Sequence, residues 1–167
     1  MVYLDLKTKS QLFVLPMTGP ETERKPHPFA QTSFNETWGQ FSPDGRWIAY
    51  ASDESRRNEI YVAPFPGGDG KRQISTNGGE QPLWREDSRE IFYIAPDRQL
   101  MAAEVTVKGG VLQVDAVRAL FGPIPVTNGA AYDVANKGQR FLVRIVPQTT
   151  NTEPLTAVRN WTSTLKK

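Results

Sequence analysis

The fold of this chain is decided by one stretch, Phe41-Ser42-Pro43-Asp44-Gly45-Arg46-Trp47-Ile48-Ala49-Tyr50. Pro43 presets φ for the second position of a type I turn, and Asp44 suits the third position. Gly45 accepts the left-handed conformation from which the next strand leaves in register. The residues on either side alternate as a half-buried strand requires. The stretch therefore predicts a β-hairpin.

The hairpin recurs along the chain. A second copy, 83–93, places Trp84 where the first has Phe41, at an offset of 43 residues, and a weaker third copy spans 134–143. The segment 60–64 likewise repeats 12–16 at an offset of 48. Periods of about 40 to 50 residues with four short strands each are typical of β-propeller blades. An antiparallel meander would also give spaced hairpins, but here two kinds of segment recur in the same order.

We therefore predict an all-β fold in which residues 1–167 form a single segment of a β-propeller with three to four blades of four-stranded antiparallel sheets. The blades are expected at 1–34 (partial), 38–76, 80–121 and 130–161 (partial). The predicted strands are 2–6, 11–17, 25–31, 38–42, 46–52, 59–65, 72–75, 81–85, 90–95, 100–107, 112–120, 131–135, 140–146 and 156–161. The predicted strands make only two complete blades and two partial ones, fewer than the four to eight complete blades of a closed ring. We expect either a piece of a longer chain or a homo-oligomer that closes the ring.

Composition limits the classes of partner. Lysine and arginine number 20 against 18 acidic residues, with the two signs interleaved, so we expect no nucleic-acid surface. No stretch reaches the 18 apolar residues of a membrane span, and none resembles a signal peptide, so we expect no membrane insertion of this segment. The absence of cysteine excludes disulfides and thiolate metal sites. We expect neither a cofactor nor a bound metal.

Sequence motifs favour a non-catalytic protein. His27, the only histidine, lies in an extended Pro-rich segment, so a Ser-His-Asp triad or a histidine metal cluster is not expected. The nucleophile elbow of serine hydrolases and the signature loops of protein kinases are missing. A competing reading is a propeller enzyme with a carboxylate site in its central channel, for which Glu36 and Glu80 are the candidates.

Binding is expected on the face where the loops between strands B and C and between successive blades gather. Loops held by a rigid sheet are the usual place for recognition. They combine a tryptophan, carboxylates, arginines and amides, which suits a protein, a peptide or a small polar ligand. The candidate binding residues are Asn35, Glu36, Trp38, Asp53, Arg56, Arg57, Glu80 and Gln81.

The run FSPDGRWIAYASDESRRNEIYVAPFPGGDGKRQISTNGGEQPLWREDSREIFYIAPDRQLMAAEV, with RALF, GQRFLV and NWTSTLKK after it, resembles TolB-like (WD-repeat-like) β-propellers. These are six-bladed and are attached to bacterial transmembrane serine/threonine protein kinases. The second hairpin departs from the pattern at Glu86 and Ser88, so we expect a looser turn there.

The resemblance implies the C-terminal part of a sensor or interaction module on the extracytoplasmic, periplasmic side of a bacterial membrane; a separate chain would be cytoplasmic. Two further functions stay open. One is the carboxylate enzyme, of a glycosidase or lactonase type. The other is the propeller part of a prolyl-oligopeptidase-type protein, since such enzymes also carry a propeller.

Overall fold

A computed structural model describes residues 2–5, 9–30, 32–67, 69–125 and 129–145. Two short 3₁₀ turns, η1 (Glu21–Glu23) and η2 (Asn136–Gly138), accompany the strands. The strands are β1 (Val2–Asp5), β2 (Gln11–Val14), β3 (His27–Pro28), β4 (Glu36–Phe41), β5 (Trp47–Ser52), β6 (Glu59–Pro64), β7 (Arg72–Gln73), β8 (Glu80–Trp84), β9 (Glu90–Ile94), β10 (Leu100–Lys108), β11 (Val111–Phe121), β12 (Tyr132–Ala135) and β13 (Arg140–Val143).

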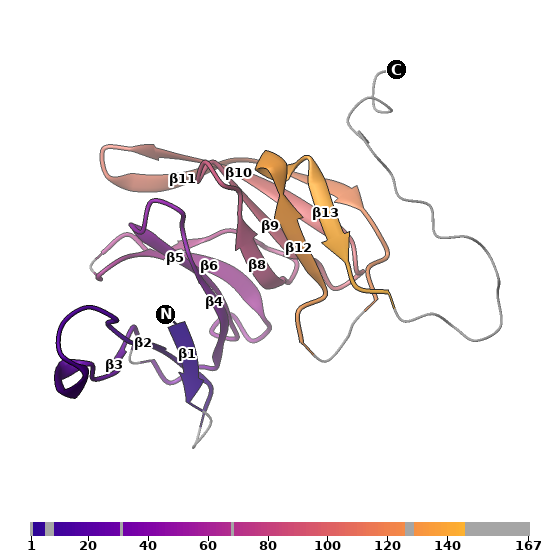
Figure 1. The fold of residues 1–167 in the computed structure, drawn as a ribbon. Coiled ribbons are helices and arrows are strands. Elements are labelled where there is room, and N and C mark those ends of the chain that lie inside the picture. The colour runs from indigo at the N-terminus through magenta and orange to yellow at the C-terminus, as the bar shows by residue number, and fades with distance from the viewer. Residues whose placement is uncertain (1, 6–8, 31, 68, 126–128, 146–167) are drawn as a thin grey trace.

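The strands form successive antiparallel sheets, each built from consecutive segments of the chain. The described sheets have the orders β1-β2-β3, β4-β5-β6-β7, β8-β9-β10-β11 and β12-β13, and they are called here blades 1 to 4. Figure 1 shows them following one another from the indigo to the yellow end of the chain. The predicted all-β, partial propeller is confirmed. The strand expected at 156–161 lies outside the described residues.

The turn that decides the fold has the predicted geometry. Gly45 has φ 71°, and its N–H donates to the carbonyl of Ser42 at 2.8 Å. The Asp44 carboxylate accepts from the Ser42 hydroxyl at 2.6 Å and from the Arg46 N–H at 3.1 Å. These hydrogen bonds lower the pKa of Asp44 although its partial burial opposes the shift. Asp44 is thus a turn residue, as predicted.

The second hairpin turn is as well bonded as the first, although a looser turn was expected. Ser88 takes the left-handed position with φ 61°, and its N–H donates to the Arg85 carbonyl at 2.9 Å. Asp87 accepts from the Arg89 N–H at 3.1 Å and pairs with the Arg85 guanidinium at 2.7 Å. The carboxylate therefore holds the turn without a glycine, because the same hydrogen bonds form around it.

The innermost strand of blades 2 and 3 carries a bulge at the same place. Pairing of β4 with β5 is interrupted between Thr37 and Gln40, and pairing of β8 with β9 between Glu80 and Leu83. Each interruption contains a residue with positive φ, Trp38 at 58° and Gln81 at 54°. Such bulges bend a strand and redirect a side chain.

The core lies between neighbouring blades. One cluster of buried residues joins blades 2 and 3 and includes Trp47, Ile60, Trp84 and Tyr93. Two others lie between blades 1 and 2 and between blades 3 and 4. The Trp84 indole N–H also donates to the carbonyl of Gln40 in blade 2, at 3.2 Å. The aromatic side chains at repeated positions thus pack blade against blade.

The hairpin of β10 and β11 extends past its own blade. β9 pairs with β10 only as far as Glu104, whereas β10 and β11 stay paired to Lys108 and Val111. Gly109 and Gly110, both with positive φ, make the two-residue turn. Figure 1 shows this hairpin reaching over β5 and β6. Its residues Val105 and Leu112 are 3% and 1% exposed and belong to the core between blades 2 and 3.

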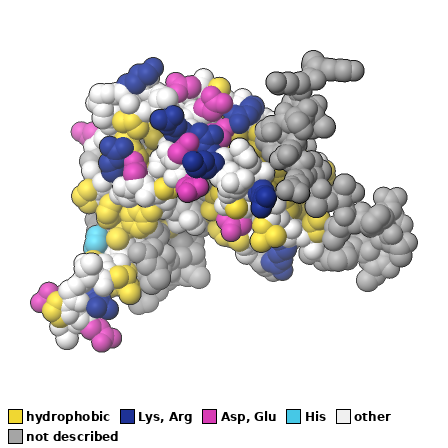
Figure 2. Space-filling view, turned by 45° about the horizontal axis from the view of Figure 1, so that its top comes forward, with side chains coloured by type: hydrophobic (Ala, Val, Ile, Leu, Met, Phe, Trp, Pro, Cys, Tyr) yellow, Lys and Arg dark blue, Asp and Glu magenta, His cyan; other side chains and the backbone are white. Residues whose placement is uncertain are grey.

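The surface carries both signs of charge. Figure 2 shows lysine and arginine side chains interleaved with aspartate and glutamate on one face. Arg118, for example, pairs with Glu90 and, at 2.9 Å, with Glu104. Across the described part of the chain, none of the helices has the length and apolarity needed to cross a bilayer.

Candidate functional site

Two loops between strands B and C define the candidate binding face. The loop of blade 2 runs from Asp53 to Asn58, between β5 and β6, and that of blade 3 from Ala95 to Gln99, between β9 and β10. Arg56 (φ 74°) and Arg98 (φ 67°) occupy the same position in these turns. Their N–H groups donate to the carbonyls of the residues three positions earlier, at 2.9 and 2.8 Å. Blades 2 and 3 therefore each place an arginine at the same position of this turn.

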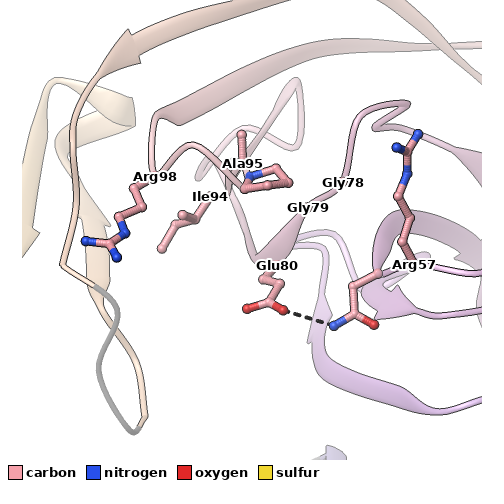
Figure 3. A pocket seen from close by; sticks show the side chains of 9 residues that line it. Arg57, Gly78, Gly79, Glu80, Ile94, Ala95 and Arg98 are labelled. Carbon is pink, nitrogen blue, oxygen red and sulfur yellow. Dashed lines mark hydrogen bonds between the residues drawn. The ribbon is translucent and has the colours of Figure 1, made fainter.

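A cavity of about 420 Å³ opens between these loops. Figure 3 shows it between blades 2 and 3, with Arg98 at one end, Arg57 at the other and Glu80 between them in this view. Its lining combines charged and amide groups with apolar side chains. The lining residues are Arg57, Asn58, Gly78, Gly79, Glu80, Ile94, Ala95, Pro96 and Arg98.

Two glycines allow the loops to come this close. A β-carbon on Gly78, whose φ is 94°, would lie 2.4 Å from Cγ of Pro96. One on Gly79 would lie 2.7 Å from Cγ1 of Ile60 and 3.0 Å from Cδ2 of Tyr93. These separations are shorter than van der Waals contact, so any larger residue would push the wall of the cavity away from the core.

A buried carboxylate holds the loop before blade 3 in place. Glu59 is 1% exposed, and its Oε1 accepts from Nε of Arg57 at 2.7 Å. Its Oε2 accepts from the N–H of Gly78 at 2.9 Å and from the hydroxyl of Ser75. Arg57 also donates to the carbonyl of Thr76. Arg57, predicted as a binding residue, thus also has a structural role beneath the cavity.

Charged groups of the cavity remain available to a ligand. Oε1 of Glu80 accepts from Nδ2 of Asn58 at 2.9 Å, whereas its Oε2 has no partner among the described residues. The guanidinium of Arg98 is exposed and likewise makes no hydrogen bond or ion pair within the described part. Counting contacts among the described residues, the cavity is therefore lined by one cation without a partner and one carboxylate with a single hydrogen bond.

Three other predicted residues are tied to the fold. Asn35 donates to the Asp53 carboxylate from Nδ2 at 2.6 Å and from its backbone N–H at 2.9 Å. These hydrogen bonds lower the pKa of Asp53. Gln81 accepts from the N–H of Ala131 at 2.8 Å, and its carbonyl accepts from the hydroxyl of Tyr132 at 2.8 Å. Asn35 and Asp53 join two loops, and Gln81 joins blades 3 and 4.

Glu36, also predicted, is buried at the start of β4. It is 1% exposed, and Oε1 accepts from the Thr32 hydroxyl at 2.9 Å. Oε2 is buried and has no hydrogen-bond partner among the described residues. Burial raises the pKa of this carboxyl above its usual value, against the opposing effect of the Thr32 hydrogen bond. An acid in this position is not open to a substrate.

We predict that Glu36→Gln changes how stability depends on pH. Below the usual pKa, 4.5, the carboxyl is protonated in both folded and unfolded chains. As pH rises, the unfolded chain loses this proton first, so the wild type loses stability until the raised folded pKa is passed. Glutamine cannot ionise. The stability of the variant relative to wild type should therefore increase as pH rises above 4.5, measured by urea unfolding at a series of pH values between 4 and 7. A constant difference across that range would contradict this.

The structure brings only part of the predicted site together. Arg57 and Glu80 line the cavity, while Trp38, 36% exposed, and Arg56 lie outside its lining. Sequence reasoning missed Asn58 and Arg98. Arg98 was detectable, because it follows Arg56 by 42 residues, close to the repeat of the blades. In the described ranges, no three histidine or acidic side chains are grouped as metal ligands.

Comparison with known proteins supports the fold. No protein-family model matches this chain, and a search of curated proteins found no match. Among solved structures, a TolB from Acinetobacter baumannii gives a TM-score of 0.56 at 12% identity, over 84% of this chain and 33% of that protein. A TolB from Agrobacterium tumefaciens gives 0.53 at 14%, over 68% of this chain and 43% of that one.

This chain therefore spans less than half the length of each of those TolB structures. At such identities the likeness concerns the fold alone. Together with the sheet order, it shows that the described residues have the fold of a partial, TolB-like β-propeller.

Proposed function

We propose that this chain is a non-catalytic recognition module that binds a protein, a peptide or a small polar ligand on the face formed by its B–C and inter-blade loops. The observation that carries the proposal is the make-up of this face, which holds a cavity between blades 2 and 3 lined by Glu80 and Arg98, together with exposed Trp38 and Arg56 outside that lining. Sites of this kind combine an apolar wall with a few placed polar groups. The loops stand on packed sheets, which keeps their side chains in position.

The proposal extends to the context implied by the sequence resemblance. In that context the chain is the C-terminal part of a sensor propeller on the extracytoplasmic side of a bacterial membrane, and a serine/threonine kinase domain precedes it. A ligand bound at the loop face would then change the balance between the active and inactive states of the kinase receptor. The sequence of the full gene product tests this part, because a kinase domain and a membrane span upstream are required.

The alternative function, a propeller enzyme with two catalytic carboxylates, has less support than the recognition role. Its two candidate acids differ in surroundings, since Glu36 is buried against Thr32 whereas Glu80 lines an open cavity. A glycosidase needs both carboxyl groups to face the substrate. A recognition role needs no such pair, so we prefer it.

Selection of peptides tests the recognition role. Random dodecapeptides displayed on phage would be selected on the 167-residue chain, and each enriched peptide then measured against Trp38→Asn/Arg56→Gln. Asparagine tolerates the positive φ at position 38. We expect the double variant to lose most of the binding and to keep its unfolding temperature. Enriched peptides that bind it as tightly as wild type would place recognition elsewhere.

A further inference from the structure

We propose that the cavity between blades 2 and 3 binds a small zwitterion with an apolar body, either an amino acid or a dipeptide. The carboxylate of Glu80 would hold the ligand's ammonium group, and the guanidinium of Arg98 would hold its carboxylate. This inference rests on the proposed recognition role of the loop face and specifies the ligand class of one subsite.

Charge balance is the first argument. Four charged groups belong to the cavity and its support, but Arg57 is already paired with buried Glu59 at 2.7 Å. That leaves Arg98 as a free cation and Glu80 as an anion with one free oxygen, among the described residues. The site is therefore neutral and dipolar. A ligand with a single charge would pair with one of these groups and leave the other without a counter-charge, whereas a zwitterion pairs both.

The second argument is the shape of the site and its apolar part. Ile94, Ala95 and Pro96 line the cavity together with Gly78 and Gly79. In Figure 3 Ile94 lies between Arg98 and Glu80, and Ala95 lies above it in this view. An aliphatic side chain on the ligand can cover these groups and exclude water from the ion pairs, which strengthens both. A volume of about 420 Å³ is within the range of small-ligand sites.

The third argument is that the site is held ready before binding. Asn58 donates to Oε1 of Glu80 at 2.9 Å, which orients the carboxylate. The Glu59 carboxylate fixes the loop at Gly78 from below. Arg98 occupies a hydrogen-bonded turn, with its N–H on the carbonyl of Ala95 at 2.8 Å. Little main-chain ordering remains to oppose ligand binding.

Isothermal titration calorimetry on the 167-residue chain tests the proposal with matched probes. The probes are L-leucine, L-leucylglycine, N-acetyl-L-leucylglycine and L-leucylglycinamide. The acetyl group removes the ammonium charge, and the amide removes the carboxylate. We expect leucine or leucylglycine to bind, and each blocked dipeptide to bind at least about tenfold more weakly than leucylglycine.

Variants assign each charge to its residue. Arg98→Gln should weaken leucylglycine about tenfold and leave the amide unchanged. Glu80→Gln should weaken leucylglycine and leave the acetylated dipeptide unchanged. Arg89→Gln and Glu86→Gln make the same chemical changes in the β8–β9 turn, at the opposite end of the strands, and should bind as wild type. Unfolding temperatures confirm that all four variants are folded.

Several results would overturn the proposal. These are equal binding of blocked and free dipeptides, loss of binding in the control variants to the same degree, or no binding of either zwitterion. Loss of the selected dodecapeptides in Trp38→Asn/Arg56→Gln, without binding of any zwitterion, would refute this inference and keep the recognition role. If a zwitterion binds but the double variant binds the selected peptides as well as wild type does, the zwitterion site is supported. Recognition of peptides by the wider loop face is then refuted.

Discussion

Replacing Glu59 with alanine should lower the free energy of unfolding by about 3 kcal/mol, because two buried donors lose their acceptor. The hydroxyl of Ser75 and the N–H of Gly78 both bond to Glu59, and both residues are buried. Each buried donor left without a partner costs about 1–3 kcal/mol. Arg57, whose side chain is 58% exposed, can regain water and adds little. Urea unfolding followed by tryptophan fluorescence measures the loss.

A matched control for this variant is Glu104→Ala. Glu104 also pairs with an arginine, Arg118, at 2.9 Å, but its side chain is 53% exposed. An exposed pair contributes less than about 1 kcal/mol. Equal losses in the two variants would show that the contacts of Glu59 beneath the cavity stabilise the fold no more than an exposed ion pair does. Glu59→Ala should also bind leucylglycine more weakly, because the loop at Gly78 is no longer fixed.

Leu112→Ala should cost about 3 kcal/mol, the usual loss for a buried leucine. Leu112 belongs to the part of the β10–β11 hairpin that extends past its blade, yet it is 1% exposed in the core between blades 2 and 3. The truncation leaves a space that neither blade can fill alone. Thermal and urea unfolding should show the loss as one cooperative transition.

Val117→Ala on the same strand is the control for Leu112. Val117 is 45% exposed, so its truncation should cost less than about 1 kcal/mol. If Leu112→Ala lowered the free energy of unfolding as little as Val117→Ala, the end of the hairpin would not contribute to the packing of blade 2 against blade 3. A separate early transition in that variant would show that the hairpin unfolds independently.

Local signals predicted most of the architecture. The Pro43-Asp44-Gly45 turn has the expected hydrogen bonds, and its repetition indicated blades because turn chemistry and strand alternation act over a few residues. Even the turn at Ser88, which lacks the usual glycine, was found through its place in the repeat. Its bonding was underestimated, because the Asp87 carboxylate supplies what the backbone pattern lacks.

The site depended on contacts between distant segments, which local patterns do not reveal. Glu36 was predicted in a loop but is buried by Thr32 and the neighbouring blade. Arg57 was predicted as a binding residue, but it also pairs with a carboxylate beneath the cavity. Arg98 was overlooked although it matches Arg56 in the repeat, and nothing in the sequence of its own loop shows that it lines the same cavity as Glu80. Which loops meet is decided by how the blades pack.

The bulges at Trp38 and Gln81 share one main-chain conformation but carry different side chains. Both positions have φ between 50° and 60°, yet one side chain is a partly exposed indole and the other a buried amide that joins two blades. Equivalent positions of two blades thus hold side chains of different chemistry, a tryptophan and a glutamine. For protein engineering, position 38 is a place where a new binding specificity can be introduced, starting from asparagine, which tolerates the positive φ. Position 81 is not such a place, because its side chain joins blades 3 and 4.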